Sequence, residues 1–326
     1  MFIASPGGAE ARIMDNIASG LSFAGLDLEV RRSNRIRGFR FEHLGLIKRS
    51  DIVLLHTPLL MSWHYAFLAR LFGKTIVSIV WDSYPVTLGG VRFDRRMRRR
   101  LFDRIENTAL SASNRLLVPS QDFLEQPILH RAKAVRLWYA IHAPNMDSGP
   151  ASYRHGDDEP LKVLFAGQIN RTRGLAAATE QLHRVTQGRF QLLIASGDPL
   201  PPELSGRPDV RHLGKLDREN LRRVAAGCDC GLVALACDFD GPGLPSKTFE
   251  YLEAGIPCLY YGKRLEHYLD VLEWSGAGIE IGARANLTRD DVLAKKADIA
   301  NATIRFSDAF ALDRVELIAH LGPVQE

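Results

Sequence analysis

Short apolar runs alternate with amphipathic segments along the whole chain. This alternation predicts an α/β architecture built on parallel sheets. In the first half, apolar runs of strand length predict strands at Phe2–Ser5, Asp27–Arg31, Asp51–His56, Thr75–Val80 and Arg115–Pro119. Between them, apolar residues at helical spacing predict helices at Ala9–Ala24, Trp63–Phe72 and Asp94–Ser111.

The same alternation restarts after Pro144–Pro160, a stretch of Gly, Ser and Asp that is typical of an exposed linker. Beyond it, the pattern predicts strands at Leu161–Ala166, Phe190–Ala195, Val210–Leu213, Asp229–Ala234 and Pro257–Tyr260. It predicts helices at Arg173–Val185, Arg218–Ala226, Ser246–Ala254, Arg264–Trp274 and Arg289–Ile304, and a last amphipathic segment at Ser307–His320. We therefore expect two Rossmann-like domains, residues 1–150 and 151–305, which face a central cleft. Residues 306–326 are expected to form a helix that packs back on the first domain.

Composition places the chain among ordinary globular proteins. It has 326 residues, of which 46% are hydrophobic and 25% charged, which is enough for two domains of typical size. No apolar run reaches the roughly 20 residues of a spanning helix, and the N-terminus lacks the basic residues of a secretory signal. Cys228 and Cys230 alternate along an apolar run, which favours buried reduced thiols over a metal site. We expect a cytoplasmic protein.

Charge is distributed unevenly. Residues 1–150 hold 21 Lys or Arg and 13 Asp or Glu, a net charge of +8, whereas the rest of the chain has a net charge of −4. This asymmetry points to anionic partners for the first half. Within it, Arg95–Arg104 is either a solvated helix face or a contact with an anionic membrane surface. Nucleic acid is not predicted as a partner, because no aromatic interleaving or reader module accompanies the charge.

The most informative segment is Pro242–Pro257, a Gly/Pro-rich loop followed by a short helix pattern. The backbone N–H groups of Ser246, Lys247 and Thr248 are expected to be unpaired at the helix start, where phosphate binds readily. Lys247 adds a full positive charge, and Glu250 one turn on can accept hydrogen bonds from hydroxyl groups. An anion site beside such a carboxylate suits a nucleoside diphosphate and its ribose. The segment also fits an ordinary helix start with a solvated Lys and Glu.

Two glycine turns follow predicted strands. Gly7 and Gly8 come directly after the first strand, where glycines let the backbone approach a ligand closely. Gly167 ends the first strand of the second half and is followed by Arg171 and Arg173 at a predicted helix start. Arginine grips phosphate in a bidentate manner. Plain turns and a solvated loop are the alternatives for these two segments.

The order of these motifs resembles a known enzyme class. Gly-Gly-Ala-Glu, then G-x(5)-R-G, then P-S-K-x-F-E-Y-x-x-A-G-x-P is similar to the pattern of nucleotide-sugar glycosyltransferases of the GT-B fold. The resemblance covers nearly the whole chain and is closest to the retaining group called glycosyltransferase family 4. It implies transfer of a sugar (hexosyl type) from a UDP- or GDP-type donor to a glycan or lipid-linked acceptor. It also implies no bound cofactor or metal, and a role in bacterial-type polysaccharide or glycolipid assembly at the inner face of the membrane.

The resemblance also implies residue roles. Glu250 matches the glutamate that holds the donor ribose, and Arg173 matches the basic residue that grips the donor diphosphate. Lys247 matches a lysine of a subgroup with a P-[SN]-K start, and Arg173 and Lys247 would act as catalytic residues by stabilising the leaving diphosphate. The implied donor site comprises Gly7, Gly8, Gly167, Gln168, Arg173, Gly243, Leu244, Ser246, Lys247, Thr248 and Glu250.

Three positions depart from the family pattern. Pro242 stands where the first of two glutamates is expected, Gln168 replaces an arginine, and Trp81 replaces a histidine. Asp82 follows an apolar strand and is predicted either to orient the acceptor hydroxyl as a third catalytic residue or to cap a turn. The departures leave two alternatives open: a non-catalytic GT-B subunit that binds nucleotide or glycan, and a sugar-nucleotide epimerase of similar fold.

Overall fold

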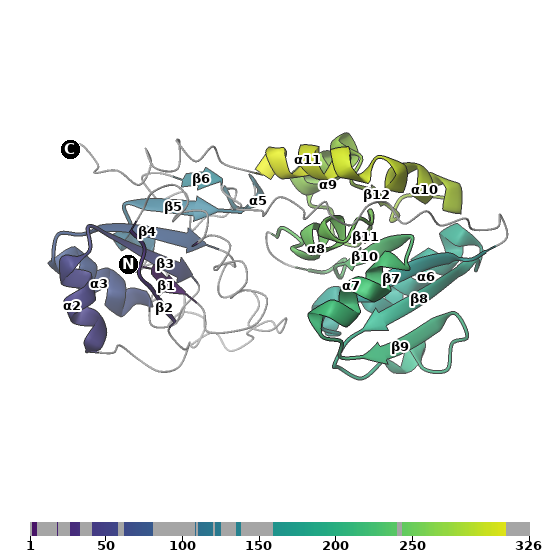
Figure 1. Cartoon of the computed structure of the whole chain (residues 1–326), viewed down its shortest axis with the longest axis horizontal. Helices are drawn as coiled ribbons and strands as arrows, with labels where there is room; N and C mark the ends of the chain where they lie inside the picture. The colour runs from purple at the N-terminus through teal and green to yellow at the C-terminus, as the bar shows by residue number, and fades with distance from the viewer. Residues whose placement is uncertain are drawn as a thin grey trace. The chain divides into compact units, whose positions relative to one another are not determined.

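The computed structural model describes residues 2–4, 18, 27–32, 41–57, 62–80, 108, 110–119, 121–124, 135–137, 159–239 and 243–310. The chain forms two compact units (Figure 1). The first unit comprises Met1–His142, Asp240–Leu244 and Phe310–Glu326, and the second comprises Ala143–Phe239 and Pro245–Ala309. The predicted boundary between residues 150 and 151 lies outside the described residues.

The first unit contains a six-stranded parallel sheet with the order β2-β1-β3-β4-β5-β6. The strands are β1 (Phe2–Ala4), β2 (Val30–Arg32), β3 (Ile52–Thr57), β4 (Thr75–Val80), β5 (Arg115–Val118) and β6 (Val135–Leu137). The described helices of this unit are α2 (Glu42–Arg49), α3 (Ser62–Leu71) and α5 (Gln121–Leu124). Strand order reverses at β1, as in a doubly wound sheet.

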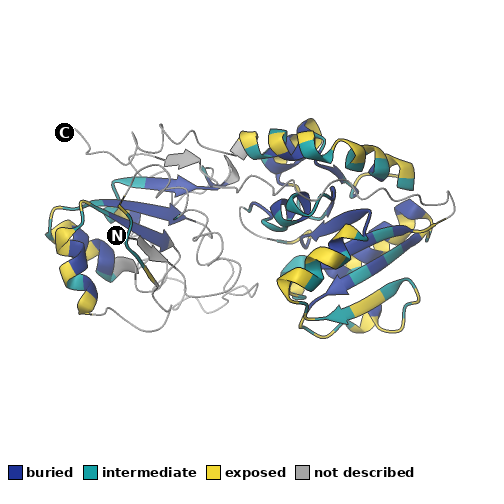
Figure 2. Ribbon diagram, in the orientation of Figure 1, coloured by how far each residue is buried: buried dark blue, intermediate teal, exposed yellow. Residues whose placement is uncertain are grey.

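The core of the first unit lies between the sheet and the inner faces of α2 and α3 (Figure 2). Strand β4 is buried from Ile76 to Val80, as is typical of a parallel strand covered on both faces. Its one polar side chain in this stretch, Ser78, lies 2.8 Å from the hydroxyl of Ser113. Leu46 and Ile47 of α2 pack with Tyr65 of α3 in one buried cluster.

The second unit contains a six-stranded parallel sheet with the order β12-β11-β10-β7-β8-β9. Its strands are β7 (Leu161–Ala166), β8 (Phe190–Ala195), β9 (Val210–Gly214), β10 (Cys230–Ala234), β11 (Cys258–Tyr261) and β12 (Gly278–Glu280). Counted from β7, this is the strand order of dinucleotide-binding Rossmann domains. Its helices are η2 (Arg171–Arg173), α6 (Leu175–Thr186), η3 (Pro202–Leu204), α7 (Arg218–Ala226), α8 (Lys247–Glu253), α9 (Glu266–Ser275), α10 (Arg289–Ala297) and α11 (Ile299–Phe310).

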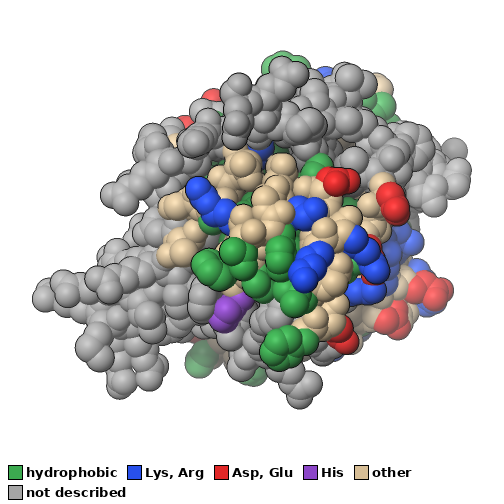
Figure 3. All heavy atoms as spheres, turned by 90° about the vertical axis from the view of Figure 1, so that its left-hand side faces the viewer, with side chains coloured by type: hydrophobic (Ala, Val, Ile, Leu, Met, Phe, Trp, Pro, Cys, Tyr) green, Lys and Arg blue, Asp and Glu red, His purple; other side chains and the backbone are tan. Residues whose placement is uncertain are grey.

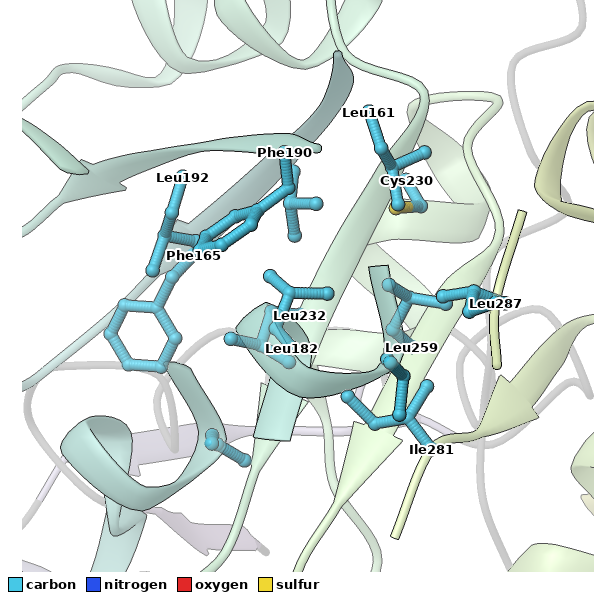
Figure 4. Packing of buried hydrophobic residues seen from close by; sticks show 14 of the residues in the cluster. Leu161, Phe165, Leu182, Phe190, Leu192, Cys230, Leu232, Leu259, Ile281 and Leu287 are labelled. Carbon is cyan, nitrogen blue, oxygen red and sulfur yellow. The ribbon is translucent and has the colours of Figure 1, made fainter. Parts of the chain in front are cut away.

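One buried cluster holds this second sheet together (Figure 4). Phe165 of β7 and Leu192 of β8 pack with Leu182 of α6, and Leu232 and Leu259 extend the cluster across β10 and β11. The cluster draws on the central strands and on α6, so the carboxyl ends of those strands are held at fixed positions.

The predicted parallel α/β architecture is confirmed, with three corrections. Helix α6 begins at Leu175 and not at Arg173, because Gly174 has a left-handed φ of 56° and separates it from η2. The single helix predicted at Arg289–Ile304 is two helices that meet at Asp298. The second of them continues to Phe310, through the predicted domain boundary at residues 305 and 306. Elements that the pattern did not predict are α2, α5, η3, β6 and β12.

All four cysteines lie in the second unit and are free thiols. Cys228, Cys230 and Cys258 are buried and Cys237 is exposed. Burial raises the pKa of the Cys228 thiol to about 12, and also raises the pKa values of Cys230 and Cys258. These three thiols are therefore neutral at physiological pH.

Candidate functional site

The predicted donor-site residues of the second unit gather around the carboxyl ends of β7 and β10. These two strands are neighbours, and the strand order reverses between them. The connections that follow them cross to opposite sides, β7 leading through α6 to β8 and β10 through α8 to β11. In open α/β sheets, ligands bind in the crevice at this kind of switch point.

Tyr251 fixes α8 to this end of the sheet. Its ring is buried, and its hydroxyl accepts a hydrogen bond from the backbone N–H of Ala166 at 2.9 Å. The hydroxyl also donates to the carbonyl oxygen of Leu232 at 3.3 Å. Burial raises the pKa of Tyr251 well above its usual value, so the hydroxyl keeps the proton that it donates. Helix α8 is thereby tied to the carboxyl end of β7 and to the middle of β10, the two strands that flank the switch point.

Gly231 in β10 makes room for that ring. A methyl group at Gly231 would lie 2.3 Å from the ring carbons of Tyr251, a distance that no side chain tolerates. A glycine inside a strand often marks such a close approach. The position of α8 therefore depends on Gly231 as well as on Tyr251.

Thr248 connects α8 to α9 and is not available to a ligand. Its side chain is fully buried, and its hydroxyl lies 2.7 Å from the hydroxyl of Tyr268. Its backbone N–H donates to the carbonyl oxygen of Pro245 at 3.1 Å. The prediction of an unpaired Thr248 N–H is therefore wrong, because the first turn of α8 closes on Pro245. Ser246, the residue before α8, already has helical backbone angles.

Lys247 and Glu250 form the charged part of the site. The Nζ atom of Lys247 donates to Oε2 of Glu250 at 2.5 Å. Their side chains are 28% and 25% exposed, so both charges are shielded yet reachable from solvent. The pair brings a cation and a hydroxyl-binding carboxylate together at the start of α8. Since α8 has only seven residues, the charge of Lys247 outweighs the helix dipole as a source of anion attraction.

The turn after β7 lies against Lys247. Gly167 has a φ of 149°, a conformation open only to glycine, and a methyl group there would be 3.5 Å from Cε of Lys247. The N–H of Gly167 donates to the carbonyl oxygen of Ala195 at 3.1 Å. The N–H of Ile169 donates to Oδ2 of Asp198 at 2.8 Å, which ties this turn to the loop after β8. Gln168 lies between these two anchored residues and is exposed.

Arg173 lies on the other loop that borders the switch point. It ends η2 and is half-buried. The N–H of Ala236, just beyond β10, donates to the carbonyl oxygen of Thr172 at 2.8 Å. A methyl group at the neighbouring Gly174 would come within 3.0 Å of Cα of Ala236. The loop that carries Arg173 is thus pinned to the end of β10, the strand that leads to α8.

The remaining predicted residues fall elsewhere. Gly7, Gly8 and Asp82, together with the departures Trp81 and Pro242, lie outside the described residues. Gly243 and Leu244 come directly before the α8 turn and group with the first unit. Their predicted roles stay predictions.

Sequence reasoning missed the residues that position the site. Tyr251, Asp198 and Tyr268 hold the donor-site backbone through the contacts described above. The signal that could have found Tyr251 is Gly231, a glycine inside a fully buried strand. Nothing in the local sequence distinguishes Asp198 from an ordinary turn residue.

The chain matches no family model and no curated protein. It is similar to several solved structures. HepE of Anabaena, in complex with UDP, is 13% identical with a TM-score of 0.65, over 98% of this chain and 97% of that one. Sucrose-phosphate synthase of Thermosynechococcus elongatus is 13% identical with a TM-score of 0.60, over 98% and 96% of the two chains.

Both structures are GT-B glycosyltransferases, and the similarity spans nearly the whole of each chain. The chain has the GT-B fold. MnaA of S. aureus, solved with UDP, is 14% identical with a TM-score of 0.51, over 98% and 94% of the two chains. The narrower resemblance to glycosyltransferase family 4 stays a prediction.

Proposed function

We propose that this chain is a glycosyltransferase that moves a sugar from a nucleotide diphosphate-sugar to an acceptor hydroxyl. The observation that carries the proposal is the Lys247–Glu250 pair, which lies beside the glycine turn at Gly167 where the strand order reverses. The fold supports it, because HepE and MnaA, both similar in fold, were solved with UDP.

Transfer of the sugar requires that the leaving nucleoside diphosphate be stabilised. The bond between the anomeric carbon of the donor sugar and the diphosphate oxygen breaks, and negative charge develops on the diphosphate. Lys247 and Arg173 would offset this charge, and preorganised charges of this kind are usually the largest catalytic contribution. Glu250 would accept hydrogen bonds from the ribose hydroxyls. The acceptor hydroxyl forms the new bond, and its proton passes to the leaving phosphate.

Finer parts of the proposal follow from the sequence resemblance. We propose retention of the anomeric configuration and a reaction that uses no metal ion, with cationic side chains supplying the charge. Asp82 would orient the acceptor hydroxyl, and Gly7 and Gly8 would face the diphosphate. A glycan or lipid-linked acceptor and a role in polysaccharide or glycolipid assembly complete the proposal.

A lipid-linked acceptor would require the protein to reach a membrane surface. No helix in the described part of the chain is long and apolar enough to cross a membrane. Contact of Arg95–Arg104 with an anionic membrane surface stays a prediction, since these residues lie outside the described ones.

Calorimetric titration tests the donor site. We expect Lys247→Ala and Arg173→Ala each to weaken UDP or GDP binding by about 1.5–3 kcal/mol, the value typical of hydrogen bonds to charged groups. Lys295→Ala on α10 is the matched control, because it removes a lysine from another helix of the same unit. Unchanged binding in both site variants would show that the phosphate site is wrongly assigned.

Incubation with a panel of nucleotide sugars and a lipid extract separates the activities. Transfer of the sugar to an acceptor supports the proposal. Isomerisation of the donor without an acceptor would identify a sugar-nucleotide epimerase. Tight nucleotide binding without turnover would identify a non-catalytic subunit, to which the Pro242, Gln168 and Trp81 departures point.

A further inference from the structure

Helices α2 and α3 of the first unit present large apolar side chains to solvent. Phe67 and Leu71 lie one turn apart on α3 and are 61% and 65% exposed. Phe41, directly before α2, is 86% exposed. On the described surface in Figure 3, hydrophobic side chains gather in the middle with Lys and Arg side chains beside them. We call this surface, formed by the outward sides of α2 and α3, the α2–α3 face.

Contacts between the two helices show that they lie side by side. Nδ1 of His43 on α2 is 2.8 Å from the hydroxyl of Tyr65 on α3. Five residues further along α2, Nζ of Lys48 lies 5.1 Å from the ring centre of Phe72, the residue directly after α3. The two helices therefore lie side by side and run in the same direction.

The core does not require the exposed apolar residues. Helix α3 buries Tyr65, Ala66 and Ala69 against the sheet and α2, which accounts for its inner face. Phe67 and Leu71 lie on the opposite side of the helix from these residues and are exposed. Single exposed apolar residues are common, but contiguous apolar surface that is bordered by polar residues marks an interaction site.

The charges on and directly after α3 are positive. Residues 52–80 contain no Asp or Glu. Lys48, Arg70 and Lys74 border the exposed apolar side chains, and none of these three has an ion-pair partner among the residues that the structure describes. Arg49 differs, because its guanidinium is 2.9 Å from a carboxylate oxygen of Glu29.

Among the described residues, the acidic groups near α2 are Glu42 and Asp51 at its two ends and Glu29, which pairs with Arg49. Glu42 begins the helix and Asp51 follows it, and both are exposed. The exposed side of α3 thus combines Phe67 and Leu71 with Arg70 and with no carboxylate of its own helix.

We propose that the α2–α3 face docks on an anionic lipid bilayer. An aromatic and an aliphatic side chain beside Lys and Arg is the composition of helices that lie in the membrane interface. The apolar side chains would enter the boundary between headgroups and acyl chains, while the cations contact lipid phosphates. Each basic residue near an anionic surface strengthens binding about fivefold. The α2–α3 face contains none of the residues assigned to the donor site, so the inference does not depend on the proposed function.

Co-sedimentation of the full chain with lipid vesicles tests the docking surface. We expect binding to phosphatidylcholine vesicles that contain phosphatidylglycerol, and much weaker binding to phosphatidylcholine alone. The double variant Phe67→Ser/Leu71→Ser should bind at least about tenfold more weakly, because it removes the inserted apolar side chains. Arg70→Gln/Lys74→Gln should weaken binding to the anionic vesicles and reduce its dependence on salt.

The matched control is Trp274→Ser/Ile304→Ser, which removes two exposed large apolar residues from the second unit. This control should bind vesicles as the unchanged chain does, and circular dichroism should show that every variant is folded. Equal binding by the Phe67/Leu71 variant overturns the proposal. So does loss of binding only when the arginines of Arg95–Arg104 are neutralised. The proposal is also overturned if the chain does not bind vesicles but forms a dimer that the Phe67/Leu71 substitutions dissociate. The α2–α3 face would then bind a second copy of the chain.

Discussion

At the scale of single residues, the ion pair between Lys247 and Glu250 sets a condition on ligand binding. Without a nucleotide, Nζ of Lys247 donates a hydrogen bond to Oε2 of Glu250 at 2.5 Å. To bind at this site, the phosphates of a nucleoside diphosphate must replace Glu250 as the partner of Lys247. The ribose hydroxyls can then donate hydrogen bonds to the Glu250 carboxylate in place of Lys247. Inorganic pyrophosphate can contact Lys247 but has no ribose hydroxyls to donate to Glu250. The pair should therefore favour nucleotides that carry a ribose over bare pyrophosphate.

The variant Glu250→Gln tests this selectivity. It removes the charge that holds Lys247 but keeps a side chain of the same shape. We expect pyrophosphate to bind several-fold more tightly, and the ratio of UDP affinity to pyrophosphate affinity to fall about tenfold, which corresponds to roughly 1.4 kcal/mol. Isothermal titration calorimetry with both ligands measures it. An unchanged ratio would show that Glu250 does not control access to Lys247.

Thiol reactivity is a second residue-scale property. Cys237 is exposed, whereas burial raises the pKa values of Cys228, Cys230 and Cys258 and keeps them as neutral, inaccessible thiols. Because only a thiolate reacts, Ellman's reagent should label one thiol of the native chain rapidly at mildly alkaline pH and all four in denaturant. Cys237→Ser should abolish the rapid phase. A rapid phase that survives this substitution would contradict the burial of the other three.

At the scale of elements, the placement of α8 depends on one contact across the sheet end. Tyr251→Phe keeps the ring and removes the acceptor of the Ala166 N–H, which is then buried and unsatisfied. The expected cost is about 1–3 kcal/mol in the free energy of unfolding, measured by urea denaturation. Thr303→Val is a useful comparison, since it removes a hydroxyl whose bond to Ile299 stays within one helix. UDP binding should weaken in the Tyr251 variant and not in the Thr303 variant.

Hydrophobic periodicity predicts the elements that are long and regularly patterned. Strands Thr75–Val80, Leu161–Ala166 and Phe190–Ala195 match the structure residue for residue, because continuous apolar runs are what buried parallel strands need. Strand β12 has three residues and too little pattern to be recognised. The break at Asp298 escapes prediction because the apolar spacing continues through it.

The candidate site shows the same division. Spacing within one helix predicts that Lys247 and Glu250 share a face, and the structure brings them together. The pairing of Thr248 with Tyr268 and of Tyr251 with Ala166 joins segments 20 and 85 residues apart in the chain. No local pattern encodes such contacts, so the anchoring of the site could not be predicted from the sequence.

At the scale of the whole molecule, the second unit has what an independent domain needs. It has a closed hydrophobic cluster and a complete six-stranded sheet. It also carries Lys247, Glu250 and Arg173, the charged groups of the proposed donor site. Most of the binding energy for a nucleoside diphosphate should therefore belong to this unit.

A fragment of residues 143–309 tests whether the second unit supplies most of the nucleotide-binding free energy. We expect it to unfold in one cooperative transition and to bind UDP within about tenfold of the affinity of the full chain, a loss of no more than roughly 1.4 kcal/mol. Lys247→Ala should weaken binding equally in the fragment and in the full chain. A folded fragment that does not bind UDP, beside a full chain that does, would transfer the decisive phosphate contacts to the first unit. Gly7 and Gly8 would then be the first residues to substitute, because the sequence places them after the first strand of that unit.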